Sequence, residues 1–133
     1  MLINNLHLLQ ILCLIFLSIL FLQSSIDKIY DWKGNIDFFK SHFSKTIFKN
    51  FVFILLVVIT LFEFAAGLFS LIGTLEIFYF KSYSASAVVG SYLSGLSIVM
   101  LFFGQRIAKD YAGAASLVPY FIVTLITIYI VSF

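Results

Sequence analysis

The chain has little charge, one cysteine and two histidines, and each scarcity excludes a class of protein. Only 11% of its 133 residues are charged, whereas a soluble domain carries about a quarter, so an ordinary globular protein is excluded. The net charge of +2 is too small to indicate a nucleic-acid partner. Cys13 alone cannot close an internal disulfide, and the widely separated His7 and His42 do not form a metal-binding motif. Hydrophobic residues make up 62% of the chain and aromatic residues 19%, and this abundance excludes a disordered protein.

Four long hydrophobic runs fill most of the chain. A membrane-spanning helix needs about 20 mainly apolar residues, and the only charge inside these runs is Glu63 in the second one. In hydrocarbon every backbone amide needs an internal partner, and four spans are too few for a barrel, so the runs are predicted to be helices. We therefore expect an all-α fold: an integral membrane antiparallel four-helix bundle, a single membrane domain over residues 1–133 in contact with the lipid bilayer. The predicted helices span about residues 4–26, 51–73, 84–106 and 116–133.

The first run could instead be a cleaved signal peptide. A signal peptide needs a positively charged start and a small-residue cleavage site. No Lys or Arg precedes this run, and no A-x-A-like site follows it. A retained membrane helix is therefore expected.

The connection between the first two runs has the pattern of a short amphipathic helix. Its apolar residues recur at helical spacing, with Lys and Asp on the other faces; they are Ile36, Phe39, Phe43 and Ile47. Such a helix lies in the membrane interface, with its apolar face toward the lipid tails and its lysines toward anionic headgroups. We therefore predict an interfacial amphipathic helix at about residues 35–49. Lysines interleaved with phenylalanines could also bind single-stranded nucleic acid by stacking, but beside two membrane spans the interfacial interpretation is preferred.

Positive charge is unevenly divided between the two sides of the predicted bundle. The first and third connections carry seven Lys and Arg residues, whereas the side with both termini and the middle connection carries only Lys81. By the positive-inside rule, the seven-charge side is cytoplasmic and both termini lie on the opposite side. The seven residues are Lys28, Lys33, Lys40, Lys45, Lys49, Arg106 and Lys109.

Glu63 lies about halfway along the second run, where a carboxylate is costly. Its charge costs several kcal/mol in a bilayer unless it is paired, hydrated or protonated. Residues of the other predicted helices that lie at the same membrane depth as Glu63 are found by counting along each helix from the seven-charge side. Five residues lie near this depth, and all but the cysteine can hydrogen-bond a carboxyl group. These residues are Gln10, Cys13, Tyr92, Ser94 and Tyr129. Glu63 is therefore either a proton carrier or ligand contact in a small cavity, or part of a structural hydrogen bond between helices.

Small residues indicate close packing of the helices. Gly67 follows Glu63 by one turn and allows a backbone or a ligand to approach the carboxylate, and Gly73 ends the second run. The third run carries two ladders of small residues four apart, which favour close helix contact over a pore lining. Pro119 is expected in the first turn of the fourth helix, where a missing amide costs little. The ladders are Ser86, Gly90 and Ser94, and Ala87, Ser91 and Gly95.

A second polar cluster is expected where the first helix ends and where the third and fourth helices join. In an antiparallel bundle these segments share one membrane face. Arg106 could then pair with Asp27, and Lys28 could pair with Asp110. Partly buried pairs of this kind fix helix register or bind an anionic or quinone-like headgroup. The alternative is that these residues are snorkelling anchors at the headgroup level.

Three stretches of the chain resemble the DoxX family. The segment FLQSSIDKIYDW at residues 21–32 resembles the end of that family's first helix, although Ser25 stands where glycine is usual. Glu63 followed by two glycines is similar to the family's second-helix pattern. The segment RIAKDYAG at residues 106–113, followed by LVPY at residues 117–120, resembles a loop that enters the last helix.

The resemblance implies a four-helix, multi-pass inner-membrane protein, often linked with redox systems; with the charge asymmetry, it puts both termini in the periplasm. The chain has no Cys-x-x-Cys motif, no histidine pair for haem and no nucleotide-binding loop, so neither a catalytic residue nor a metal site is predicted. We expect a non-catalytic membrane subunit or anchor of a larger, redox-linked complex, with other membrane subunits as partners. One alternative is a quinone-linked electron-transfer subunit with quinone as cofactor, in which Glu63 accepts protons and Arg106 or Lys28 lies near a carbonyl oxygen. Another is a small transporter or proton path. The candidate ligand-binding residues are Asp27, Lys28, Glu63, Arg106 and Asp110.

Overall fold

The computed structural model describes residues 3–133, and this part of the chain forms six helices and no strand. Four segments are long and apolar enough to cross a membrane; the last of them joins the short α5 to α6 as Tyr111–Val131. The predictions of an all-α fold and of four long apolar helices are confirmed. The helices are α1 (Asn5–Tyr30), α2 (Trp32–His42), α3 (Val52–Phe80), α4 (Ala85–Ile107), α5 (Tyr111–Ser116) and α6 (Val118–Val131).

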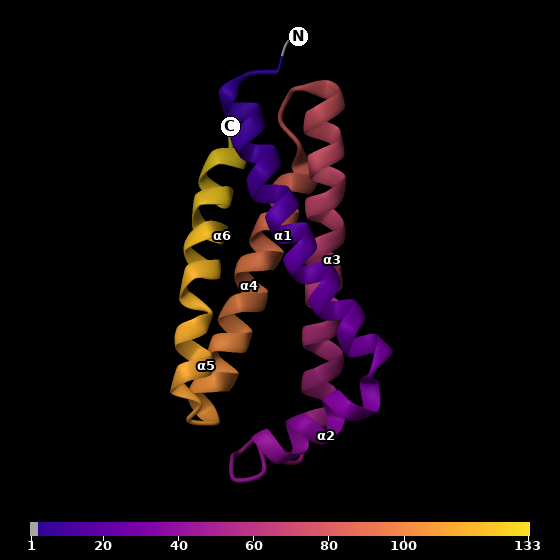
Figure 1. Ribbon diagram of the computed structural model, residues 1–133, viewed down its shortest axis with the longest axis vertical. Coiled ribbons are helices and arrows are strands. Elements are labelled where there is room, and N and C mark those ends of the chain that lie inside the picture. Colours follow the sequence, from indigo (N-terminus) through magenta and orange to yellow (C-terminus); the bar gives the residue numbers. More distant parts are fainter. Residues whose placement is uncertain (1–2) are drawn as a thin grey trace.

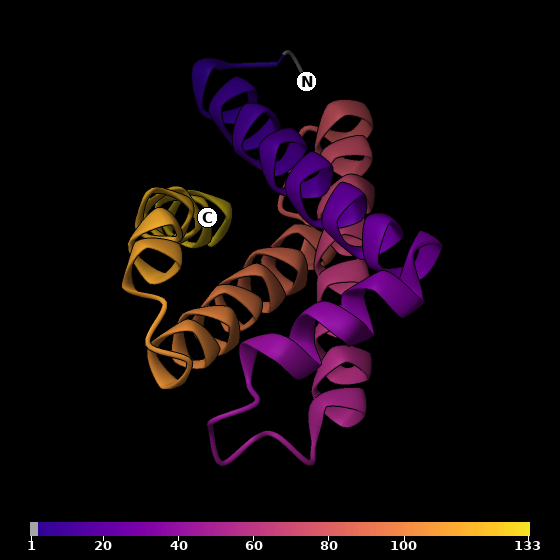
Figure 2. The ribbon, with the colours of Figure 1, turned by 60° about the horizontal axis from the view of Figure 1, so that its bottom comes forward.

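The long helices run side by side between two ends of an elongated molecule. The start of α1 and the end of α6 lie toward the top of Figure 1, whereas α2 lies at the bottom. α3 packs against both α1 and α4, and α6 packs against α4 and α1 (Figure 2). α2 crosses the lower part of α3 and reaches toward the end of α4 (Figure 2).

Glycines set the closest approaches between the long helices. A Cβ atom placed at Gly67 would lie 2.8 Å from the backbone nitrogen of Leu22, and one at Gly73 would lie 2.6 Å from the Cα of Ala87. A Cβ at Gly90 would lie 2.6 Å from the backbone nitrogen of Ser70. Van der Waals packing of this kind replaces the hydrophobic drive between helices in lipid. The packing role predicted for the small residues of α4 is confirmed at Gly90.

The distribution of side chains differs from that of a water-soluble bundle. The outward faces of the four long helices carry large apolar side chains; Leu12, Phe53 and Leu61 are each more than 60% exposed. The interior contains many hydroxyl groups, and most of them donate to a carbonyl of their own helix. An outer surface this apolar suits a hydrocarbon environment. The buried hydroxyl residues within the helices are Ser18, Ser25, Thr60, Ser70, Thr74, Ser91, Ser94, Ser97, Thr124 and Thr127.

The long helices extend beyond the expected apolar runs. α1 continues to Tyr30, and α3 continues to Phe80. α3 does not end at Gly73, because the backbone hydrogen bonds continue past it. Gly73 instead lets α3 and α4 approach each other closely at Ala87. Pro119 lies in the first turn of α6, as predicted, but α5 precedes it as a separate turn of helix.

The connection between α1 and α3 is helical over a shorter range than the expected residues 35–49. α2 ends at His42, and residues 43–50 form turns. Asp31 is both the C-terminal cap of α1 and the N-terminal cap of α2, since its backbone N–H bonds to Asp27 and its side chain accepts from the Gly34 N–H at 3.3 Å. This single residue makes the corner that turns α2 across α3.

Candidate functional site

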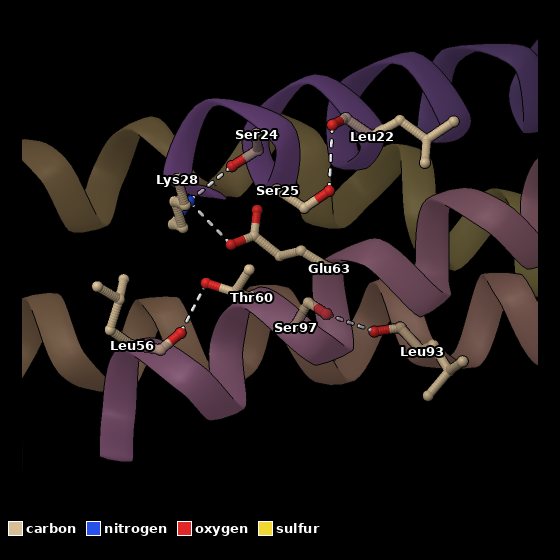
Figure 3. A network of polar contacts seen from close by, with 9 residues as sticks. All are labelled: Leu22, Ser24, Ser25, Lys28, Leu56, Thr60, Glu63, Leu93 and Ser97. Atoms are coloured by element: carbon tan, nitrogen blue, oxygen red, sulfur yellow. Dashed lines mark hydrogen bonds and ion pairs between the residues drawn. The ribbon is translucent and has the colours of Figure 1, made fainter. Parts of the chain in front are cut away.

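A buried ion pair joins α1 to α3. The ammonium group of Lys28, in the last turn of α1, lies 2.9 Å from Oε1 of Glu63 (Figure 3). The side chain of Glu63 is only 1% exposed, and that of Lys28 is 14% exposed. Solvent therefore screens this pair very little, and each charge depends on the other.

The close approach of α1 and α3 places the two charges opposite each other. Gly67, one turn beyond Glu63, accommodates the backbone of α1 at Leu22. Ser25 is fully buried on the same face of α1. Lys28 lies one turn further along this face, so its side chain reaches Glu63 without leaving the helix contact. The prediction that Gly67 lets a neighbouring backbone approach is confirmed.

The hydroxyl groups around Glu63 do not supply protons to its carboxylate. Figure 3 shows the side chains of Ser25, Thr60 and Ser97 around it. Each donates to its own helix, with distances of 3.1, 2.7 and 2.8 Å to the carbonyl oxygens one turn earlier. The Lys28 ammonium lies off the direction of a good hydrogen bond to Oε1, and no other donor within residues 3–133 reaches this oxygen. The carboxylate is therefore stabilised mainly by the charge of Lys28.

Lys28 is itself held in place by its own helix. Its ammonium donates to Ser24 Oγ at 2.8 Å, one turn earlier in α1. The contact with Glu63 is an ion pair without a well-directed hydrogen bond, so at least one of the other two N–H groups of Lys28 is uncommitted. Lys28 also lines a cavity, so the remaining N–H is available to a molecule that occupies it.

The cavity lies between α2, α3 and α4 and has a volume of about 360 Å³. This volume is within the usual range for small-molecule sites, roughly 300–1,000 Å³. Most of its wall is apolar and aromatic, and the polar exceptions are few. Glu63 is not part of the wall and stands behind Lys28. The polar lining residues are Lys28, Asn35, His42 and Gln105, and the aromatic ones are Phe38, Phe39, Phe43, Phe48 and Phe103.

A second polar contact closes the far side of the cavity. His42 Nε2 lies 2.6 Å from Gln105 Oε1, which joins the end of α2 to the last turns of α4. The His42 ring stacks on Phe38 with centroids 5.1 Å apart, and its Nε2 lies 4.0 Å from Oδ2 of Asp110. The cavity thus has polar groups at Lys28 on one side and at His42 and Gln105 on the other, and most of the wall between them is apolar.

The neighbours expected for Glu63 were wrong. The Gln10 amide donates to the Ile130 carbonyl at 2.7 Å, and Ser94 donates to the Gly90 carbonyl at 2.8 Å. Tyr92 and Tyr129 are 54% and 69% exposed and point outward, and Cys13 packs on an apolar cluster with Leu14 and Ile77.

The error has a geometric cause. Counting equal depth assumes that the helix ends are level, whereas eleven residues of α3, roughly 17 Å of helix, precede Glu63. The carboxylate is instead level with the last turn of α1.

The ion pairs expected at the bundle mouth were also wrong. The ion pairs found in residues 3–133 join Lys28 to Glu63 and His42 to Asp110. Asp110 caps α5 by accepting from the Gly113 N–H at 2.9 Å. Arg106 lies over the ring of Tyr111 at 4.7 Å, and the side chain of Asp27 is exposed. Of the candidate ligand-binding residues, only Lys28 lines the cavity.

Sequence reasoning missed Ser24, His42 and Gln105. A signal for Ser24 exists, because residues four apart on one helix face each other and Lys28 follows at that spacing. His42 and Gln105 are 63 residues apart and carry no local signal for their contact.

Comparison with family models, curated proteins and solved structures found no match.

Proposed function

We propose that this chain is a DoxX-like membrane subunit of a larger, redox-linked complex, and that it binds a membrane quinone in the cavity between α2, α3 and α4. The observation that carries the proposal is an apolar, aromatic cavity of about 360 Å³ with a charged donor, Lys28, in its wall. Aromatic walls suit a planar ring, and a few polar groups suit its carbonyl oxygens. Quinone, when bound, supplies the electron-accepting chemistry, while the electrons come from a partner subunit.

The protein residues bind and orient the ring. Lys28 donates its free N–H to a carbonyl oxygen, and Ser24 keeps the ammonium in position. Glu63 holds the Lys28 ammonium in place from the other side, since its carboxylate oxygen lies 2.9 Å from it. Arg106 takes no part, because it lies outside the cavity wall.

Exposed aromatic side chains support an antiparallel bundle that spans an inner membrane. Tyr79, Tyr83 and Tyr129 are each more than 55% exposed at the end that holds the termini, and Tyr30 is 92% exposed at the α2 end. Tyrosines of this kind gather at the two interfaces of a bilayer. On this placement α2 lies in the interface, with its lysines toward the headgroups.

The seven-charge end faces the cytoplasm in this proposal, and both termini face the periplasm. A membrane-impermeant maleimide applied to whole cells tests it, with single cysteines introduced in a Cys13→Ser background. Ser82→Cys, exposed between α3 and α4, is labelled in intact cells. Ser44→Cys, exposed after α2, is labelled only after permeabilisation. The reverse pattern refutes the orientation.

Titration with a short-tailed benzoquinone tests the ligand. Trp32 is the sole tryptophan and lies in α2, so quenching of its fluorescence reports binding. Met100→Phe fills part of the cavity and weakens binding at least about tenfold, because a larger side chain in an occupied site costs about 1–3 kcal/mol. Lys33→Met, on the exposed part of α2, binds as the wild type does. Equal quenching in all three proteins means that the quinone binds elsewhere.

A role as an anchor without a ligand is the second candidate. The exposed lysines that follow α1 gather at the end where α2 lies, which suits the docking of a partner. Purification from native membranes in a mild detergent separates the candidates. Stable co-purification with other subunits, without quinone binding, supports the anchor, whereas isolation of the chain alone argues against any complex.

A further inference from the structure

α2 covers one side of the cavity, yet it is weakly held. It contributes Asn35, Phe38, Phe39 and His42 to the cavity wall. None of its eleven residues is buried. A helix that buries so little side-chain surface opens at a small free-energy cost compared with the long helices.

The start of α2 is the fixed end. Asp31 ends α1 and caps α2, so the two helices meet at a single residue. The Trp32 ring packs edge-on against Phe53 of α3, with centroids 6.1 Å apart. Rotation about Asp31 therefore moves the far end of α2 while its first turn stays against α3.

The end of α2 is attached by one polar contact and by the buried ring of Phe43, its C-terminal cap, which lies 5.7 Å from the ring of Phe39 and 6.0 Å from that of Phe48. The hydrogen bond between His42 Nε2 and Gln105 Oε1, at 2.6 Å, is its polar contact with α4. Beside it, Phe43 packs over Gly104, where a Cβ atom would lie 3.4 Å from the ring. The carboxylate of Asp110 lies 4.0 Å from Nε2 of His42. These contacts are separate from the Lys28–Glu63 pair.

We propose that α2 is a lid that swings about Asp31, and that the His42–Gln105 hydrogen bond is the latch that holds it against α4 and narrows the opening of the cavity. The inference goes beyond the proposed function because it concerns access to the cavity and not the identity of the ligand. The cavity is already partly open, and release of the latch widens this opening, which is the route by which a ligand reaches Lys28.

A thiol reporter inside the cavity tests the lid without any ligand. Ile59 lines the cavity and is 6% exposed. Ile59→Cys, in the full chain with Cys13→Ser, is modified with a small methanethiosulfonate in detergent. His42→Phe keeps the stacking on Phe38 but removes the donor, and the modification rate rises roughly 2- to 12-fold, the effect of one hydrogen bond on a two-state closure.

Matched variants separate a latch from a general loosening. Gln105→Leu raises the rate as His42→Phe does, and the two together raise it no further than either alone. Gln105→Glu keeps an acceptor for His42 and leaves the rate at or below the wild-type value. Lys40→Gln, exposed on α2, and a reporter at Ser82→Cys show no change.

Hydrogen exchange supplies the second measurement. In His42→Phe the amides of α2 exchange faster, whereas those of α3 and α4 do not. Unchanged reporter rates in both latch variants, additive effects in the double variant, or faster exchange throughout the chain would each overturn the lid. Failure of quinone to bind leaves these results unaffected, so the two proposals fail separately.

Discussion

Replacement of Lys28 by methionine is expected to destabilise the protein strongly, because it leaves Glu63 buried without a counter-charge. Removing one partner of a buried ion pair costs about 3–5 kcal/mol. The upper half of this range is expected, since Glu63 is 1% exposed and the hydroxyls of Ser25, Thr60 and Ser97 already donate to backbone carbonyls. No donor in the immediate surroundings can replace the ammonium.

The reverse substitution is expected to cost less. In Glu63→Gln the Lys28 ammonium keeps its hydrogen bond to Ser24 at 2.8 Å and can turn toward the cavity, because its side chain is 14% exposed. A loss of about 1–3 kcal/mol is expected, which is the usual cost of an unsatisfied buried group. The double variant Lys28→Met with Glu63→Leu is expected near wild-type stability, since apolar residues of similar size often replace a buried pair without loss.

Unfolding in mixed micelles, followed by circular dichroism and by the fluorescence of Trp32, is measured for the wild type, Lys28→Met, Glu63→Leu and the double variant, which gives the four free energies of the cycle. The loss expected for Lys28→Met and the near wild-type double variant together imply a coupling of about 4 kcal/mol or more between Lys28 and Glu63, above the usual range for residues in contact. Lys33→Met is the control, because this lysine is exposed on α2. If Lys28→Met unfolds with the same free energy as the wild type, or if the two substitutions add, Glu63 is not a buried charge that depends on Lys28.

Two further predictions concern packing. Gly67→Ala places a Cβ against the backbone of α1 and lowers the free energy of unfolding by about 1–3 kcal/mol. Gly95→Ala is the control and leaves this free energy nearly unchanged, because the atom nearest to its Cβ lies at 3.5 Å. Equal effects of the two substitutions in the same unfolding assay would refute the close contact at Gly67. Gln10→Leu removes the hydrogen bond to the Ile130 carbonyl and lowers the free energy of unfolding by about 0.6–1.7 kcal/mol. Gln23→Leu, on the exposed face of α1, is the control. If the Gln10→Leu protein is as stable as this control, the hydrogen bond does not contribute to stability.

Hydropathy and local chemistry predicted the helices well. Long uncharged runs must satisfy their own amides in hydrocarbon, so the four long helices follow from the sequence. The position of Pro119 follows from its missing N–H, and the packing role of Gly90 follows from its small size. Helix ends were less predictable, because Asp27 and Lys28 are charged and yet continue the helix to Tyr30.

The candidate site was predicted residue by residue but not as an arrangement. Glu63 and Lys28 were both singled out, yet each was given the wrong partner. Their contact depends on how far α1 is displaced along α3, and this displacement follows from the close approach at Gly67. A displacement of two helices is a property of their packed surfaces and leaves no periodic signal in either sequence. The same holds for the contact between His42 and Gln105.

The depth of the ion pair favours a site at one end of the bundle over a path through it. Lys28 lies in the last turn of α1, beside the cavity, and not at the middle of the helix. Further along α1 the interior is filled by Leu14, Leu17 and Phe21, which are at most 2% exposed and span roughly 10 Å of helix. A proton path needs a chain of groups that donate and accept in turn, whereas the buried hydroxyls of Ser18, Ser91 and Ser94 in this part of the bundle each donate to a carbonyl of their own helix. The contact that Glu63 makes leads toward Lys28 and the cavity, which fits the proposed binding site better than a path across the bundle.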